Sequence, residues 1–162
     1  MKKEISDKKL AFFYLSVTLF ILLILGLLFY FWVSRPYFEV MNLNWGVSPT
    51  GAPFTEFLTK QTESGLTGDG IRLHVMECKK PEAFDEKMHQ WDGGILMERP
   101  VPVEWKERAE ELLDILGIPA EERPVYERCS AFYRVGREDS RDELLVFWDT
   151  GTNLLWILES FF

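Results

Sequence analysis

At 162 residues, with 47% hydrophobic and 27% charged side chains and a formal net charge of −8, the chain has room for one ordinary globular domain and one additional segment. The first 33 residues hold four basic and two acidic residues, which leaves 14 of the 18 basic and 24 of the 26 acidic residues, a formal charge of −10, for the rest. Such a negative domain repels phosphate backbones, so we expect no nucleic-acid partner and expect any charged partner to be basic.

An uncharged stretch from Leu10 to Ser34 dominates the N-terminal region. Its core, residues 11–33, exceeds the ~20 apolar residues that span a bilayer and would reach roughly 35 Å as a helix. A buried core helix would be amphipathic, and a cleavable signal peptide would be shorter and end in small residues. The bulky exit Phe29–Trp32 and the aromatic residues Phe12–Tyr14 at the other end resemble two interfacial belts. We therefore predict a transmembrane helix over residues 10–34.

The charged flanks predict the orientation of this helix. Four lysines precede it, whereas one basic residue, Arg35, occurs in the first fifteen residues that follow it. Because basic residues are retained on the cytoplasmic side, we expect residues 1–9 in the cytoplasm and the C-terminal domain outside. The chain is thus predicted to be a single-pass, signal-anchored protein of the cell membrane, with the lipid bilayer as its first partner. The four lysines are Lys2, Lys3, Lys8 and Lys9.

Residues 35–64 are predicted to be a linker that begins to dock on the domain, because three prolines and a glycine interrupt them. Within this segment, PFTEFLTKQTE, residues 53–63, is expected to hold a short helix that starts at a proline. The next seven residues, SGLTGDG, are predicted to be a tight turn. They do not suit a phosphate-binding loop, since they contain no lysine, lead into a strand, and place the negative charge of Asp69 at the site.

The outside domain, residues 65–162, is expected to begin with a strand. In IRLHVMEC, Ile71–Cys78, Ile71, Leu73 and Val75 alternate with Arg72, His74 and Met76, which is the pattern of a half-buried strand. A short helix is predicted from Pro81 up to residues 92–94. The strongest helix signal is VEWKERAEELLDILG, residues 103–117, whose apolar stripe should cover a sheet. The stripe comprises Trp105, Ala109, Leu112, Leu113 and Leu116.

Three further strand-like runs close the sequence. They are SAFYRVGR, ELLVFWD and NLLWILES, at residues 130–137, 143–149 and 153–160. These runs are too short and too regularly interrupted for helices. The order strand, helix, helix and three strands predicts an α+β domain, with an antiparallel sheet of about four strands and two or three helices on one face.

The motif Asp149-Thr150-Gly151-Thr152 resembles the catalytic loop of pepsin-like aspartic proteases. Such a site needs two aspartates, each in its own loop, that share one proton. The sequence holds one such motif, and ten residues follow Thr152. Asp149, Gly151 and Asn153 are turn formers between two strand-like runs, and Gly151 would offer a positive φ. We therefore predict a β-hairpin turn rather than a catalytic site.

Two cysteines and two histidines are the remaining candidates for crosslinking, metal or nucleophile chemistry. A disulfide between Cys78 and Cys129 would close a loop of about 50 residues and stabilise the domain by about 4 kcal/mol. The alternative is a pair of small buried residues that never meet, and the sequence leaves both open. His74 and His89 show no recognised zinc spacing with Cys78, and Cys78 would lie about 13 Å from His74 along a strand. We expect no catalytic residue, cofactor, metal site or enzyme activity.

Several features together resemble a loose group of small membrane-anchored or lipoprotein-like proteins of Gram-positive bacteria that have no assigned activity. These features are the run Gly68-Asp69-Gly70-Ile71 leading into a strand, Trp91 after a helical segment, the proline-flanked helix and the closing aromatic hairpin. The resemblance extends over Gly65–Phe162. It implies a bacterial source and a place outside the cytoplasm, and it transfers no functional residue.

Three functions follow as hypotheses. The favoured one is a membrane-anchored extracytoplasmic binding or accessory module, without catalytic activity, that acts on an unidentified membrane or envelope protein. The first alternative is an immunity-type protein that neutralises a toxin at the cell envelope, because an acidic domain attracts basic partners. The second alternative is an enzyme of unknown class.

Overall fold

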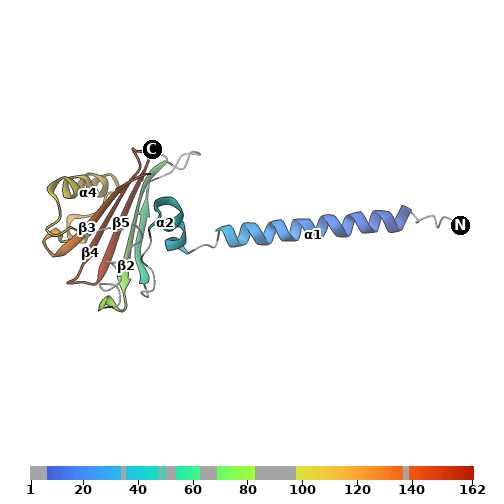
Figure 1. Ribbon diagram of the computed structural model, residues 1–162, viewed down its shortest axis with the longest axis horizontal. Coiled ribbons are helices and arrows are strands. Elements are labelled where there is room, and N and C mark those ends of the chain that lie inside the picture. Colours follow the sequence, from blue (N-terminus) through green and yellow to red (C-terminus); the bar gives the residue numbers. More distant parts are fainter. Residues whose placement is uncertain are drawn as a thin grey trace. The chain divides into compact units, whose positions relative to one another are not determined.

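A computed structural model of the protein describes residues 7–33, 36–47, 49, 54–62, 69–82, 98–136 and 139–162. The chain divides into two compact units, residues 1–40 and residues 41–162. The first unit contains the long helix α1, and the second contains a five-stranded sheet with helical segments packed on it (Figure 1).

Helix α1, Asp7–Val33, is long and apolar enough to cross a membrane. The candidate span is Phe12–Phe31, and none of it is buried inside the structure. The hydroxyl of Thr18 donates to the carbonyl oxygen of Tyr14 at 2.9 Å, so this polar group is satisfied within the helix, as an apolar environment requires. This confirms the prediction of one N-terminal apolar helix that is compatible with a single-pass membrane anchor.

The second unit is built on an antiparallel sheet with the strand order β1-β2-β5-β4-β3. Strands β4 and β5 lie inside the sheet, and they are buried at all positions except the first residue of β4 and the two end residues of β5, because both faces of the sheet are covered. The α+β class is confirmed, and the sheet has five strands instead of about four. The strands are β1, Phe54–Gln61; β2, Gly70–Cys78; β3, Cys129–Val135; β4, Glu143–Asp149; and β5, Leu154–Phe161.

Helix α4, Val103–Ile115, covers one face of the sheet, which we call the α4 face (Figure 1). Its predicted apolar stripe is confirmed, since Ala109, Leu112 and Leu113 are buried against the sheet and the Trp105 ring packs on Tyr133. Gly117, with φ of 63°, follows the helix in the left-handed conformation that glycine favours. The sheet residues in this core include Ile71, Leu73, Val75, Ala131, Leu145, Phe147, Trp156 and Leu158.

The opposite face of the sheet is covered by the end of helix α2, Tyr37–Trp45, where Met41 and Trp45 are buried. The indole Nε1 of Trp45 donates to Oε1 of Glu159 at 2.6 Å, and Glu159 is only 1% exposed. The guanidinium of Arg134 donates to the Trp45 carbonyl oxygen at 2.6 Å. The sequence placed the helices on one face, whereas the structure adds this cover on the other.

The prediction of a short helix within residues 53–63 is wrong. Within this segment Phe54–Gln61 form β1, which pairs with β2 from Phe54 opposite Cys78 to Gln61 opposite Arg72. Threonine and phenylalanine favour strands, and pairing with β2 satisfies the backbone groups that a helix would have satisfied internally. The segment 35–64, expected to be a linker, therefore supplies α2 and an edge strand of the sheet.

The other strand predictions are confirmed to within about two residues, the usual uncertainty of element ends. Helix α4 ends slightly before its predicted limit. Most of the predicted glycine turn at residues 64–70, and most of the helix predicted from Pro81, lie outside the described residues.

Candidate functional site

The Asp149 motif forms the turn between β4 and β5, so the hairpin prediction is confirmed. The Asp149 carboxylate is 2% exposed; it accepts hydrogen bonds from the Gly151 amide at 2.8 Å and from the Arg128 guanidinium at 2.7 Å. The left-handed residue of the turn is Asn153, with φ of 58°, and not Gly151 as expected. Position 151 favours glycine for a different reason, because a Cβ atom there would lie 3.2 Å from an atom of Asp149 and from an atom of Arg128.

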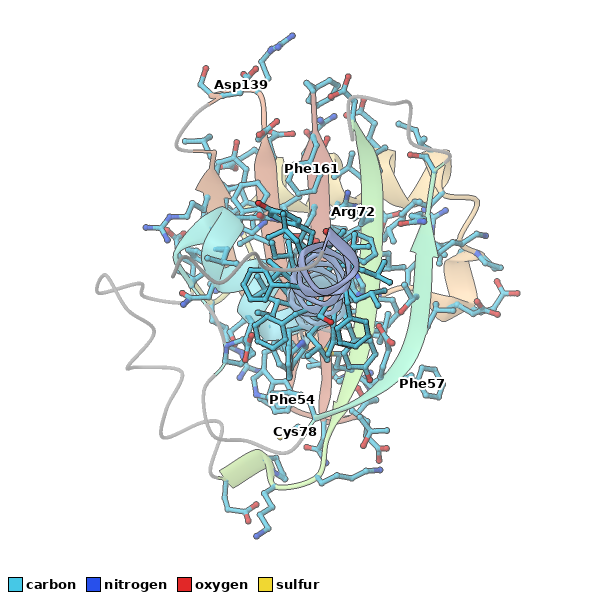
Figure 2. All side chains as sticks on the ribbon, turned by 90° about the vertical axis from the view of Figure 1, so that its right-hand side faces the viewer. Phe54, Phe57, Arg72, Cys78, Asp139 and Phe161 are labelled. Atoms are coloured by element: carbon cyan, nitrogen blue, oxygen red, sulfur yellow. The ribbon has the colours of Figure 1, made fainter. Side chains whose placement is uncertain are left out.

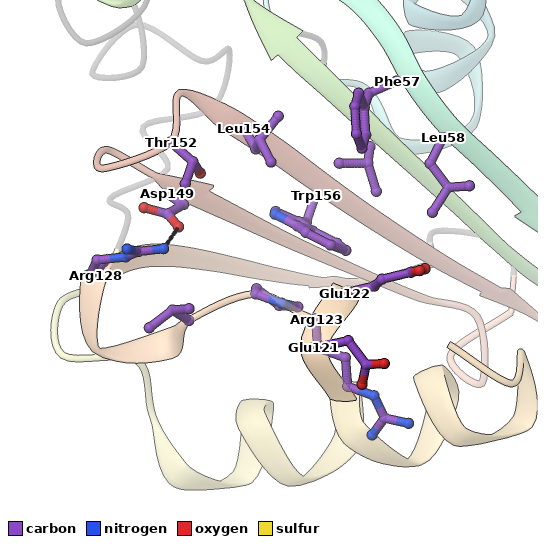
Figure 3. Close-up of a pocket in the computed structure, with 13 residues that line it drawn as sticks. Phe57, Leu58, Glu121, Glu122, Arg123, Arg128, Asp149, Thr152, Leu154 and Trp156 are labelled. Atoms are coloured by element: carbon purple, nitrogen blue, oxygen red, sulfur yellow. Dashed lines mark hydrogen bonds and ion pairs between the residues drawn. The ribbon is translucent and has the colours of Figure 1, made fainter. Parts of the chain in front are cut away.

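A groove of about 590 Å³ begins beside this turn on the α4 face. We call it the Trp156 groove, after the indole at its floor (Figure 3). One wall comes from the sheet, and the other comes from the chain between α4 and β3, which holds the short helices η1, Ala120–Glu122, and η2, Tyr126–Arg128. Its apolar lining is Phe57, Leu58, Val75, Pro124, Val125, Leu154 and Trp156.

An irregularity in β1 shapes the outer wall of the groove. The pairing register with β2 shifts between Glu56 and Leu58, which leaves Phe57 as an extra residue. A bulge of this kind places two consecutive side chains toward the same side of a strand. Phe57 and Leu58 accordingly both line the groove, and Phe57 is 72% exposed at the outer edge of the sheet (Figures 2 and 3).

The second wall is fastened to α4 by Arg123. Its guanidinium donates to Glu110 at 2.7 Å, to Asp114 at 2.6 Å and to the Ile118 carbonyl oxygen at 2.6 Å. Hydrogen bonds to the Asp114 and Glu110 carboxylates raise the pKa of Arg123, which therefore stays charged. Arg123 thus holds the wall in place.

The charged groups around the groove differ between its two ends. At one end, Arg128 and Asp149 form an ion pair at 2.7 Å (Figure 3). At the other end, Glu121 and Glu122 are exposed, and neither carboxylate has a hydrogen-bond or ion-pair partner within the described part of the chain. The arrangement can bind an apolar group against Trp156 and a positive charge beside the two glutamates.

The disulfide considered between Cys78 and Cys129 is not formed. Cys78 ends β2 and Cys129 starts β3, with β5 and β4 between these strands, which separates the cysteines by about 14 Å at ~4.8 Å per strand. Their side chains also point to opposite faces, because Cys129 belongs to the α4-face core and Cys78 alternates with residues that do. A disulfide needs Cα atoms within about 7 Å, so of the two alternatives that the sequence left open, the structure has the pair of buried cysteines that do not meet.

His74 lies on the opposite face of the sheet from the groove, beside β1. Its Nδ1 is 2.9 Å from Oε1 of Glu56, and the Thr59 hydroxyl bonds to the same carboxylate. These hydrogen bonds, the one from Thr59 first, lower the pKa of Glu56. His89 falls outside the described residues, and within these no group of three or more His, Cys, Asp or Glu is placed to bind a metal ion.

Sequence reasoning missed the groove because its walls come from five separate parts of the chain. The one local signal was an aromatic residue within a polar segment, Phe57 in FTEFLTKQ, and it was assigned to a helix. Comparison with known proteins adds no functional residue: no protein-family model matches the chain, and no curated protein or solved structure matches it.

Proposed function

We propose that this chain is a single-pass membrane protein whose domain, held outside the cell membrane, binds another protein without catalysing a reaction. The observation that carries the proposal is the presence, in one chain, of an apolar helix able to span a bilayer and of an apolar groove with an exposed aromatic side chain. The anchor would limit the domain to partners at the membrane surface, such as membrane or envelope proteins.

The polar side chains near the groove support a binding role over a chemical one. Asp149 is bonded to Arg128 and to the Gly151 amide, and Arg123 is bonded to two carboxylates of α4. A general acid or base must be able to exchange its proton with a substrate, whereas these groups are committed to holding the fold. An apolar floor with few polar groups at its ends is typical of a binding site.

The outside location rests on charge. The four lysines before the apolar span, Lys2, Lys3, Lys8 and Lys9, favour a cytoplasmic N-terminus, and the −10 charge of the remainder would be repelled by anionic headgroups of the inner leaflet. Protease treatment of intact cells that carry a C-terminal tag tests the location. We expect the tag to be lost while a cytoplasmic control protein survives.

Two results would contradict the proposal. A tag that persists until the cells are lysed, although the purified protein is cleaved, would place the domain in the cytoplasm. A hydrolytic activity that copurifies with the full chain and disappears after a single side-chain change would make the protein an enzyme.

An immunity-type protein that neutralises a toxin is the second candidate, and the negative charge of the domain favours it. Opposite charge accelerates association with a basic nuclease or pore-forming toxin. A toxin gene adjacent to this one, together with protection of cells when both are expressed, would support it. A neighbouring transporter or wall-synthesis gene, with no protection, would favour the accessory role.

A further inference from the structure

We propose that the Trp156 groove binds an extended peptide segment of a partner protein in which an aromatic or aliphatic side chain is followed by lysine or arginine. This inference rests on the proposed binding function and names the chemistry of the partner. It follows from three features of the groove: its apolar floor, its unpaired negative charge and its position beside an edge strand.

The floor and outer wall form the apolar subsite. Trp156 is only 6% exposed, so the ring is fixed by the core and offers a rigid surface. Phe57, in contrast, is 72% exposed and Val125 is 43% exposed, one on each wall. An apolar side chain inserted between these walls would remove exposed apolar surface from water, which is the main source of binding free energy at such sites.

The charges select a basic neighbour for that side chain. Arg123 is bonded to Glu110 and Asp114, and Arg128 is bonded to Asp149. Glu121 and Glu122 are left as the charged groups of the lining that no described residue pairs with. A lysine or arginine would meet uncompensated negative charge there, whereas an acidic residue would be repelled by it.

Strand β1 explains why an extended chain fits. It is an edge strand whose one neighbour in the described sheet is β2, and its residues Phe57 and Leu58 line the groove. Edge strands offer backbone hydrogen bonds to an extended peptide, while pockets beside them select alternate side chains. The bulge and the charged residues Glu56 and Lys60 in β1 would hinder pairing with a second copy of this long strand.

Peptide binding to the full chain tests the proposal. The protein is reconstituted in nanodiscs of zwitterionic phosphatidylcholine, so that basic peptides are not bound by lipid charge. Fluorescence anisotropy is measured with three labelled hexapeptides: Gly-Leu-Phe-Lys-Arg-Gly, the same peptide with Glu-Glu in place of Lys-Arg, and the same peptide with Ser-Ser in place of Leu-Phe. We expect a Kd of about 10 to 100 μM for the first peptide and at least about tenfold weaker binding of the other two.

Paired variants locate the binding site. Phe57→Ala should weaken binding about tenfold, whereas Leu43→Ala, a similar change at a side chain 65% exposed outside the groove, should not. The double variant E121Q/E122Q should weaken it about fivefold at low salt and less at high salt. The control E104Q/E107Q changes the net charge equally at two exposed residues outside the groove and should bind as the parent protein does.

Four results would overturn the proposal. They are no saturable binding of the first peptide up to about 1 mM, equal binding of the acidic peptide, binding unaffected by Phe57→Ala, and a protein dimer that dissociates on Phe57→Ala. The last result, measured by native mass spectrometry, would assign the groove to a second copy of the chain. The assay does not depend on the side of the membrane on which the domain lies, so its failure leaves the protease result to decide the proposed location.

Discussion

The two edge strands of the sheet, β1 and β3, differ in how much of each strand is buried and in which residues pair with it. In β3, three of the seven residues are buried and one is exposed, and the backbone of Ala131 exchanges two hydrogen bonds with Glu98, at 2.7 and 3.0 Å. In β1, six of the eight residues are exposed, and its one strand partner among the described residues is β2.

This difference supports the proposed place of the partner peptide. Unpaired strand edges tend to pair with other chains, so proteins cover them or make them irregular. Among the described residues, Glu98 pairs with β3, whereas β1 is protected by a bulge and by charged side chains. The Trp156 groove lies beside β1, which has no second strand neighbour among the described residues. The predictions that follow test the contrast, from the largest expected effect to the smallest.

The largest effect is expected in the covered strand. Phe132 in β3 is 5% exposed, and Phe132→Ala should lower the free energy of unfolding by about 3 to 5 kcal/mol, because it removes a buried ring and leaves a cavity. Chemical denaturation of the full chain in detergent, followed by near-ultraviolet circular dichroism, measures the change. A loss below about 1 kcal/mol would show that β3 is not covered as described.

The second prediction concerns Cys129, also in β3. Burial, and then the neighbouring charge of Asp149, raises the pKa of its thiol to about 12. The thiolate is the reactive form, so alkylation at pH 8 should be about a thousandfold slower in the folded protein than in denaturant. Peptide mass spectrometry after iodoacetamide treatment locates the modified cysteine, and Phe57→Cys in β1 provides an exposed control that should react rapidly.

The same pKa shift gives a pH dependence. The unfolded thiol loses its proton near its ordinary pKa of about 8.5, whereas the folded thiol keeps it up to a pKa of about 12. The unfolded state therefore binds fewer protons between these values, and the free energy of unfolding should fall as the pH rises through this window. A slope that is unchanged on replacing Cys129 with alanine would contradict the assignment.

A third, smaller effect compares two hydroxyl groups that each donate to a glutamate. In β3, Tyr133 donates to Glu143 at 2.9 Å in a partly buried network, and in β1, Thr59 donates to the exposed Glu56. Tyr133→Phe should lower the free energy of unfolding by about 1 kcal/mol, and Thr59→Val should change it by less than about 0.5 kcal/mol. Equal losses in the same denaturation assay would remove the distinction between the two edges.

The smallest effect on stability is expected for Phe57→Ala in β1. The ring is 72% exposed, so its removal should change the free energy of unfolding by less than about 0.5 kcal/mol, although it should weaken peptide binding. A side chain whose removal hardly changes stability but weakens peptide binding is available for binding and is not needed for folding. A loss above about 2 kcal/mol would mean that Phe57 belongs to the core.

The parts of the fold that sequence patterns predicted are those in which local pattern and burial agree. The apolar stripe of α4 and the runs in β4 and β5 are buried as their spacing indicates. Strand β1 was predicted as a helix because its strand character comes from pairing with β2 and its bulge interrupts the alternation.

Features that depend on contacts between residues far apart in the sequence could not be predicted from local sequence patterns. The bond between Trp45 and Glu159 joins residues 114 positions apart, and it accounts for a charged side chain inside the last strand. The Trp156 groove likewise combines Phe57, Val125 and Trp156, which only the folded sheet brings together. Of the candidate site residues, the sequence located the Asp149 turn, and the two cysteines it considered as a bridge lie too far apart.

The separation of Cys78 and Cys129 by two strands and by the thickness of the sheet has a consequence for biogenesis. Because the two thiols lie too far apart to form a bridge, we expect the domain to mature without a thiol oxidase or a disulfide isomerase. The same native sheet should form in a reducing cytosol and in an oxidising extracellular space.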